Sequence, residues 1–420
     1  MTAAATATER VQIDFSVYNP FDPEFVRNPF PVMERMLTQY PVAFHTGINA
    51  WLVSPHDLSS WVLRSPQFST RYQDWKDGPP PTPEDQWTLF EKCMSMSMAT
   101  VGPEVHQRLR RLTAPAFSRR VMDQIDARIR DSIADLFDEI PDPRLFNFAA
   151  DISAKVPVRS IARMVGVPPD DEELFEHRLG FNMVRASNPM YAAERDAYIE
   201  GALPGLQHLL DIITERRSRD DPGDDFIGTL VATEIDGESL SDLEILSVIV
   251  ALVVAGADTV VDMHSLGIQA LLQHPEQRQL LREKPDLMPS AVREILRWSA
   301  MGKLGAIPRF PTDDIELGGQ VLEKGSLVIP LQSPSWNDPE KWADPRQFDI
   351  TRNHAGNIIF GAGPHMCIGL HLVQVQGKLV IEEFERRFGD SASIVGELEF
   401  DHMHFNSRRI TKMMIATGES

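Results

Sequence analysis

The sequence predicts a mainly α-helical protein with a small β-rich region, and three observations support this fold class. Amphipathic segments with apolar residues at helical spacing recur along most of the chain. Strand-like segments are few and short. Of the 420 residues, 42% are hydrophobic, which is enough for a large buried core. We therefore expect one large helical domain over residues 15–420.

Several of the expected helices begin after Pro, Ser or Asp, which are common start signals. Their amphipathic runs cover residues 30–40, 57–65, 120–140, 152–167, 205–218, 275–284, 288–298 and 368–388. The most apolar run, Ile245–Ala257, is shorter than the roughly 20 residues of a membrane span. We therefore expect a buried helix there and no membrane association. Strands are expected at 42–54 and at Asp314–Gln332, where paired turn residues favour hairpins.

Three segments carry no clear periodic pattern. Residues 1–14 have no apolar core of signal-peptide length and no basic lead, so we expect a mobile N-terminal tail. Tyr72–Thr100 contains a proline triplet and is expected to be an ordered loop with short helical turns. Ser335–Asn357 is long and irregular, which in a compact protein indicates a functional segment or an unrecognised element.

Charge and cysteine content exclude some classes of function. The net charge of -20 argues against a nucleic-acid partner, because phosphate binding needs a basic surface. Cys93 and Cys367 cannot form a disulfide framework, so we expect a reducing compartment and a cytoplasmic protein. A local basic island, His106–Leu112 with Ser118–Arg120, is the exception to the overall acidity.

Cys367 lies in the stretch "NIIFGAGPHMCIGLHL", between glycine-rich turns and an expected helix. It could be a buried structural thiol, a nucleophile with His365 or His371 as base, or a metal ligand. The surrounding glycines favour close approach by a flat partner, and a helix N-terminus favours a thiolate. Zinc would need further Cys or His ligands at characteristic spacing, and none are evident. One axial thiolate on a haem iron fits this pattern better.

The segment "FGAGPHMCIG" resembles the haem-binding loop of the cytochrome P-450 family, F-G-x-G-x-H/R-x-C-x-G. The matching residues are Phe360, Gly361, Gly363, His365, Cys367 and Gly369. The resemblance implies that Cys367 is the proximal ligand of the iron of haem b. It also implies that Phe360 packs beside the sulfur and that the glycines, including Gly361, let backbone N–H groups reach it. The fold it implies is a triangular, mostly helical prism with a small β region.

The buried run provides a second match in "AGADT", Ala255–Thr259, which resembles the family motif A-G-x-D/E-T. From the residues alone, a threonine that bonds back to a carbonyl one turn earlier is equally acceptable. The resemblance implies that Thr259 and Asp258 hold water and relay protons to dioxygen, and that Gly256 opens space for the oxygen. An acid beside a hydroxyl in an apolar helix is otherwise costly to bury.

Further segments resemble family motifs that hold haem or support the fold. His106 and Arg110 match an H-x-x-x-R pair for the haem propionates, and Arg309 and His365 resemble the other propionate donors. Glu294 and Arg297 resemble a structural E-x-x-R pair. Its usual third member is an Arg in a P-x-R-F pattern, but this chain reads "PRQF", so we expect Arg346 or Gln347 to complete the network. Other arginines are expected to surround the proximal surface, which is the face of the protein on the Cys367 side of the haem. They are Arg108, Arg111, Arg119 and Arg120.

Taken together, the resemblance implies a haem-thiolate monooxygenase that activates dioxygen to hydroxylate or epoxidise an apolar small molecule, in secondary metabolism. No flavin-binding segment is evident, so the implied electron donors are a separate ferredoxin and ferredoxin reductase, and the chain is expected to be a monomer. Methionines in the segments that the resemblance places around the substrate pocket, including Met183 and Met301, favour an adaptable apolar site, and Lys303 is a candidate partner for a substrate carboxylate. The alternatives are a peroxygenase with the same fold, a haem-thiolate sensor and a cysteine hydrolase.

Overall fold

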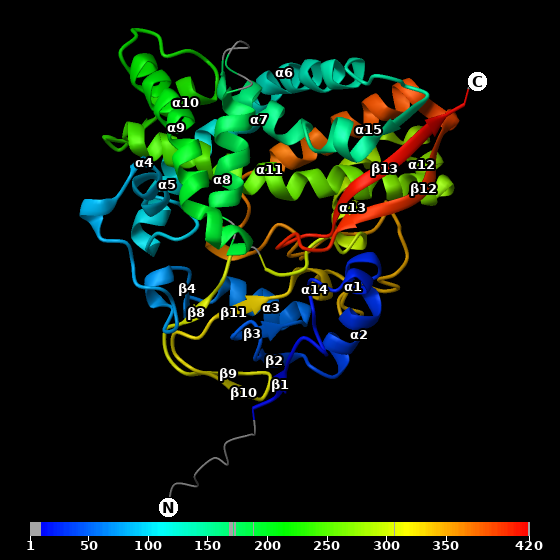
Figure 1. Cartoon of the computed structure of the whole chain (residues 1–420), viewed down its shortest axis with the longest axis horizontal. Helices are drawn as coiled ribbons and strands as arrows, with labels where there is room; N and C mark the ends of the chain where they lie inside the picture. Colours follow the sequence, from blue (N-terminus) through cyan, green and yellow to red (C-terminus); the bar gives the residue numbers. More distant parts are fainter. Residues whose placement is uncertain (1–9, 168–170, 172–173, 188, 306, 419–420) are drawn as a thin grey trace, which may run out of the picture.

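A computed structural model of the chain describes residues 10–167, 171, 174–187, 189–305 and 307–418. The α-helices are α1 (Pro23–Arg27), α2 (Phe30–Thr38), α3 (His56–Arg64), α4 (Leu89–Ser95), α5 (Pro103–Thr113), α6 (Arg119–Asp138), α7 (Val156–Val165), α8 (Phe181–Ala186), α9 (Arg195–Arg217), α10 (Phe226–Ala232), α11 (Asp242–Gln273), α12 (Pro275–Glu283), α13 (Met288–Trp298), α14 (Gln332–Trp336) and α15 (Leu370–Phe388). The helices gather in the wider part of the molecule and small sheets form its narrower end (Figure 1), as the sequence predicts.

The strands form small sheets. They are β1 (Gln12–Ile13), β2 (Val42–His45), β3 (Ala50–Val53), β4 (Phe68–Ser69), β5 (Leu145–Asn147), β6 (Glu234–Ile235), β7 (Glu238–Ser239), β8 (Phe310–Pro311), β9 (Ile315–Leu317), β10 (Gln320–Leu322), β11 (Val328–Pro330), β12 (Ala392–Asp401) and β13 (Arg409–Thr417). A four-stranded sheet has the order β1-β2-β3-β11, and a three-stranded sheet has the order β12-β13-β5. The long β12–β13 hairpin lies beside the helical part (Figure 1).

The expected tail over residues 1–14 does not extend to residue 14. Strand β1 pairs in parallel with β2, and Arg10 forms an ion pair with Glu323 at 2.6 Å. Ile13 is buried in a core cluster of the β-rich region. Residues 10–14 therefore belong to the folded domain, because the sheet supplies backbone partners that no local sequence pattern shows.

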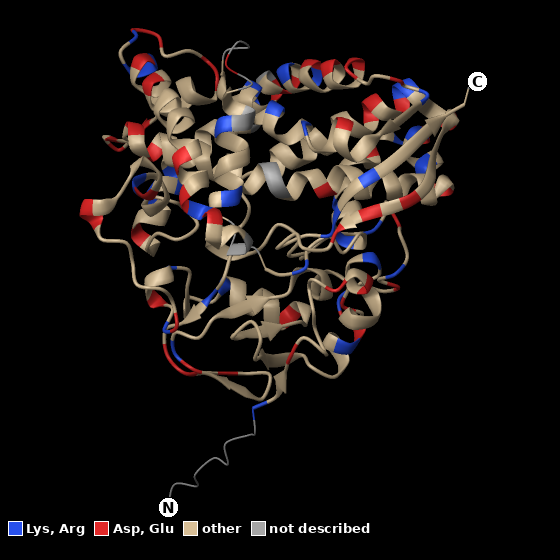
Figure 2. Cartoon of the chain, viewed as in Figure 1, with Lys and Arg blue, Asp and Glu red and all other residues tan. Residues whose placement is uncertain are grey.

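Helix α11 is the central element of the fold. It begins with a capping box, in which Ser241 and Glu244 satisfy each other's backbone N–H groups. It contacts α4, α7, α8, α9, α13, α15 and the β12–β13 hairpin. By length and composition it could cross a membrane, yet 62% of its most apolar window is buried inside the molecule. The charged side chains gather instead on outer elements, as the intermixed acids and bases along α6 show (Figure 2).

A buried ion network fixes the irregular segment after α14. Arg297 donates to both carboxylate oxygens of Glu294, at 2.7 and 2.8 Å, and both side chains are fully buried. The third member is Arg352, whose Nε lies 3.2 Å from Glu294 Oε1. The expectation that Arg346 or Gln347 completes the network is therefore wrong. The Arg346 guanidinium stacks on the ring of Phe30, and Gln347 contributes its backbone carbonyl only.

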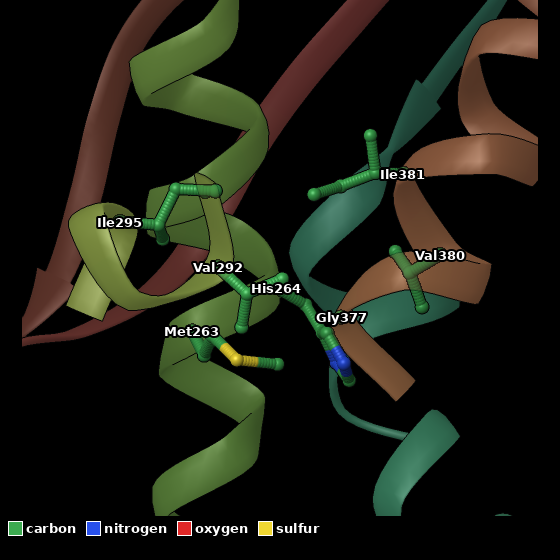
Figure 3. Close-up of a pocket in the computed structure, with 8 residues that line it drawn as sticks. Met263, His264, Val292, Ile295, Gly377, Val380 and Ile381 are labelled. Atoms are coloured by element: carbon green, nitrogen blue, oxygen red, sulfur yellow. The ribbon is translucent and has the colours of Figure 1, made fainter. Parts of the chain in front are cut away.

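A narrow cavity lies where α11, α13 and α15 meet. Residues from the three helices line it: Met263, His264, Gly267, Val292, Ile295, Gly377, Val380 and Ile381. Figure 3 labels all of them except Gly267. A Cβ at Gly377 would lie 3.1 Å from Met263 Cε and from Val292 Cγ2, so this glycine lets the helices approach. His264 is 3% exposed and neither ring nitrogen has a hydrogen-bond partner among the described residues.

Candidate functional site

The loop around Cys367 is a tight turn that ends three residues before α15. The Cys367 N–H donates to the Phe360 carbonyl at 2.8 Å. Gly361 and Gly363 have φ values of 75° and 69°, in the left-handed region that favours glycine. A Cβ at Gly363 would also lie 2.9 Å from the Leu63 carbonyl oxygen, so the loop sits directly on α3. Backbone geometry therefore requires two of the motif glycines, Gly361 and Gly363, whereas Gly369 has a φ of -81° that other residues can adopt.

In the absence of a bound cation, the surroundings of Cys367 disfavour the ionised form of its thiol. Burial raises the pKa of the Cys367 thiol, while the Gly369 N–H and the positive charge of Arg110 act in the opposite direction. The expectation that the following helix favours a thiolate is thus outweighed by desolvation. A metal cation deprotonates a coordinating thiol outright, so this sulfur becomes a stable anion when a cation is bound to it.

Four basic side chains from distant segments gather near Cys367. The rings of His106 on α5 and His365 in the cysteine loop are 4.2 Å apart between centroids. Burial, followed by the charges of His106, Arg309 and Arg110, lowers the pKa of His365 to about 3. Burial lowers the pKa of Arg309 to about 10, and its side chain is 2% exposed. The structure therefore brings together the residues that the resemblance assigns to the haem propionates.

This basic cluster fits a bound dianion. Among the described residues, no carboxylate forms an ion pair with His106, Arg110, Arg309 or His365. Arg309 donates only to the neighbouring carbonyls of Ile307 and Pro308, at 2.9 and 3.3 Å. Buried basic groups without acids are costly unless a ligand supplies the negative charge. The donor set thus fits a haem, whose two propionates these groups would bind and whose iron Cys367 Sγ would ligate.

One stripe of α11 is accessible although the helix around it is buried. Ala251, Ala255 and Thr259 are spaced by four residues and share one face of the helix. The Thr259 hydroxyl donates to the Ala255 carbonyl at 2.8 Å, so the back-bonded geometry that the sequence allowed is present. The lone pairs of its oxygen remain available to accept a hydrogen bond from a donor on the accessible stripe.

The other two positions of the α11 motif are placed differently. A Cβ at Gly256 would lie 3.0 Å from Ile161 Cδ1 on α7. This glycine therefore permits close helix packing, which accounts for it without the oxygen space that the resemblance implies. The backbone of Asp258 lies within α11, but its side chain falls outside the described residues.

Contacts within the protein engage three of the basic residues that the sequence singles out. Arg108 pairs with Glu244 at 2.6 Å, and Arg111 pairs with Asp236 at 2.9 Å. The local acids therefore neutralise part of the expected basic ring. Lys303 donates from Nζ to the His402 carbonyl at 3.1 Å and is fully buried, so its ammonium group is held by the protein itself.

Phe360 is brought to the cysteine loop through its backbone carbonyl, and its side chain packs against the main core cluster. Sequence reasoning missed Arg352, whose side chain reaches Glu294 across 58 residues. The described part of the chain holds no group of three or more His, Cys, Asp or Glu side chains suited to a metal ion. Among those residues, Cys367 therefore belongs to no such group.

Comparison with known proteins agrees with this site. The family model for Cytochrome P450 matches residues 206–392. Cytochrome P450 CYP107DY1 of Priestia megaterium is 32% identical, with 81% of this chain and 83% of that protein aligned. The monooxygenase PikC of Streptomyces venezuelae is 31% identical over 89% and 88% of the two chains, and epothilone C/D epoxidase of Sorangium cellulosum is 28% identical over 88% of each.

The fold agrees as well. The structure of epothilone B-bound P450epoK superposes with a TM-score of 0.86 at 26% identity, covering 96% of this chain and all of that one. Two relatives above 30% identity over more than four-fifths of the chain, together with the cysteine loop and its basic cluster, settle the assignment. The chain belongs to the cytochrome P450 family of haem-thiolate monooxygenases.

Proposed function

We propose that this cytochrome P450 hydroxylates or epoxidises an apolar small molecule of natural-product type, with Cys367 as the axial ligand of its haem iron. The observation that carries the proposal is the glycine-rich loop around Cys367 beside a basic cluster that has no acidic partner among the described residues. We propose that a single folded domain carries this activity and that it runs from about residue 10 to the C-terminal hairpin.

The residues of this chain have distinct tasks around the cofactor. Haem b with a thiolate ligand uses dioxygen and two electrons to insert one oxygen atom into a C–H or C=C bond. Arg110 and Arg309, together with His106 and His365, would hold the propionates by charge-assisted hydrogen bonds. The Gly369 N–H donates to the sulfur of Cys367 and, with Arg110, stabilises its negative charge.

Proton supply is assigned to α11. Because Thr259 donates its only hydroxyl proton to the Ala255 carbonyl, its oxygen acts as an acceptor toward the accessible stripe. It can therefore hold a water or another proton donor at Oγ1. Asp258 is proposed as the acid that renews this proton, on the basis of the motif.

The substrate proposal is a sizeable apolar compound such as a polyketide, terpenoid or fatty-acid-like molecule. It is supported by the relatives, of which one is named as an epothilone epoxidase and another as a 6-deoxyerythronolide B hydroxylase. The methionines near the expected pocket support it less. Met183 and Met301 are buried in the main core, where they act as packing residues.

The electron donor is proposed to be a ferredoxin reduced by its own reductase. A groove beside the cysteine loop is lined by Arg293, His354, Phe360, Gly361 and Met366, among others. Met366 is 45% exposed, so the groove offers the partner protein an apolar side chain together with the cation of Arg293, near Cys367. We propose that the enzyme acts as a soluble cytoplasmic monomer.

The test is the absorption spectrum of the reduced carbon-monoxide complex. The wild-type protein is expected to show the long-wavelength Soret band of a thiolate ligand. Cys367→Ser should abolish this band, whereas the matched control Cys93→Ser, at the other buried cysteine, should keep it. A wild-type protein without the band, or a Cys367→Ser protein that retains it, would disprove the assigned ligand.

A further inference from the structure

A buried carboxylate on α11 holds the turn between β12 and β13. Asp262 is fully buried, and its Oδ1 lies 3.1 Å from Arg409 Nε while its Oδ2 lies 3.3 Å from Arg409 Nη2. The Ser407 hydroxyl makes a short hydrogen bond to Asp262 Oδ2. Both partners come from the end of the hairpin turn, 145 and 147 residues away from Asp262.

Ser407 also connects this carboxylate to a histidine within the turn. Its backbone N–H donates to His404 Nδ1 at 3.2 Å, and its hydroxyl oxygen lies 2.9 Å from the same nitrogen. Because the N–H can only donate, Nδ1 of the neutral ring is an acceptor, and the Ser407 hydroxyl proton points to Asp262. His404 and Ser407 are both buried, so the turn is braced internally before it meets α11.

The opposite side of the turn is fastened by backbone contacts. Lys303 N–H donates to the Asn406 carbonyl at 2.7 Å, and Arg408 N–H donates to the Met301 carbonyl at 2.8 Å. The turn is therefore held between two supports, residues 301–303 and α11. Within it, Met403 is 49% exposed, so the braced turn presents an apolar side chain outward.

The α11 support lies next to the proposed reaction site. Asp262 follows Thr259 by three residues, which places it about 4.5 Å further along the axis and about 60° around the helix. A turn attached at Asp262 therefore stands within one helical turn of the accessible stripe formed by Ala251, Ala255 and Thr259. A turn held at this place would form a wall for a substrate that lies on the stripe.

We propose that Asp262 is a positioning residue that sets the place of turn 402–408 beside the stripe, and that it thereby determines the size and orientation of the substrate. The proposal deepens the proposed function and rests on it for the location of the substrate. A buried ion pair is seldom the most stable way to join two elements, but its directional bonds fix one register. Arg409 and Ser407 make three such contacts with the Asp262 carboxylate.

The test combines Asp262→Asn and Ser407→Ala with a matched control, Ser393→Ala, at an exposed serine of the same hairpin. Hydrogen exchange of peptides covering residues 402–408 reports how firmly the turn is held, and it needs no substrate. Exchange there should become about tenfold faster in both variants, the effect of losing one hydrogen bond to a charged group. The control should exchange like the wild type. Unchanged exchange in both variants would overturn the positioning role.

Two iron-binding probes then test the effect on the pocket. Imidazole is too small to contact the turn, whereas 4-phenylimidazole carries an additional ring beside the iron. The variants should change the Kd of 4-phenylimidazole by about threefold or more and leave that of imidazole nearly constant, because only the larger probe meets the turn. Equal effects on both probes, or on neither, would overturn the role in specificity. A wild-type protein without the thiolate spectrum would instead refute the proposed function, and the exchange result would stand apart from it.

Discussion

Replacement of His264 by leucine is expected to stabilise the protein and to change how its stability depends on pH. The side chain is 3% exposed in the cavity between α11, α13 and α15, and both ring nitrogens lack a partner among the described residues. A buried polar group without a hydrogen bond costs about 1–3 kcal/mol. Leucine has a similar volume and no polar atoms, so we expect a gain of about 1–2 kcal/mol at pH 7.

The pH dependence follows from the ring's protonation. Burial lowers the pKa of His264 to about 3, from 6.5 in the unfolded chain. Below pH 6.5 the unfolded state binds a proton that the native state does not bind, so the wild-type loses stability as the pH falls toward about 3. The slope is about 1.4 kcal/mol per pH unit, which amounts to about 2.7 kcal/mol between pH 6.5 and 4.5.

The assay is urea unfolding at pH 7.0, 5.5 and 4.5, followed by far-ultraviolet circular dichroism, for wild type and His264→Leu. Because other histidines titrate in both proteins, the difference between the two curves isolates His264. His371→Gln, at an exposed position of α15, is the control and should stay within about 0.5 kcal/mol of the wild type. If the advantage of His264→Leu is the same at all three pH values, the ring is not held neutral by burial, and the reasoning is refuted.

Two further variants test the supporting network and the α11 motif. Arg352→Gln removes a cation from the fully buried Glu294 and should lower the free energy of unfolding by about 3 kcal/mol. The control Arg346→Gln should lower it by less than about 1 kcal/mol. Equal losses of the two variants in urea unfolding would contradict the assignment of Arg352 as the third member of the Glu294–Arg297 network. Thr259→Ala removes the hydrogen-bond acceptor on the accessible stripe and should slow product formation by about a hundredfold, while the reducing equivalents form peroxide instead. An unchanged ratio of product formed to reductant consumed would show that Thr259 is not part of the proton path.

The sequence predicted those features whose causes are local. The cysteine loop could be recognised because the left-handed backbone at Gly361 and Gly363 leaves few other residues possible there. The central helix could be recognised from its apolar run and its capping residues, Ser241 and Glu244. In both cases the residues that create the geometry lie within one or two turns of each other, so a single segment contains the signal.

Features that depend on distant partners could not be predicted in this way. Arg352 and Arg346 stand six residues apart in the same irregular segment, and only the folded path of the chain decides which of them reaches Glu294. Likewise, Arg108 is neutralised by Glu244, which is 136 residues away. The periodicity of α5 shows that such a side chain is on the surface and cannot show which acid will meet it.

Two buried clusters of charged residues illustrate how structural and functional arrangements differ. In the first, the carboxylate of Glu294 accepts from Arg297 and Arg352, so the protein itself supplies partners of opposite charge. In the second, the basic groups around His365 have no described acid, and their pKa values fall because they are buried together. A fold gains nothing by leaving such a cluster incomplete. The deficit of negative charge beside Cys367 is therefore explained by a ligand that brings two carboxylates, and haem b meets that requirement.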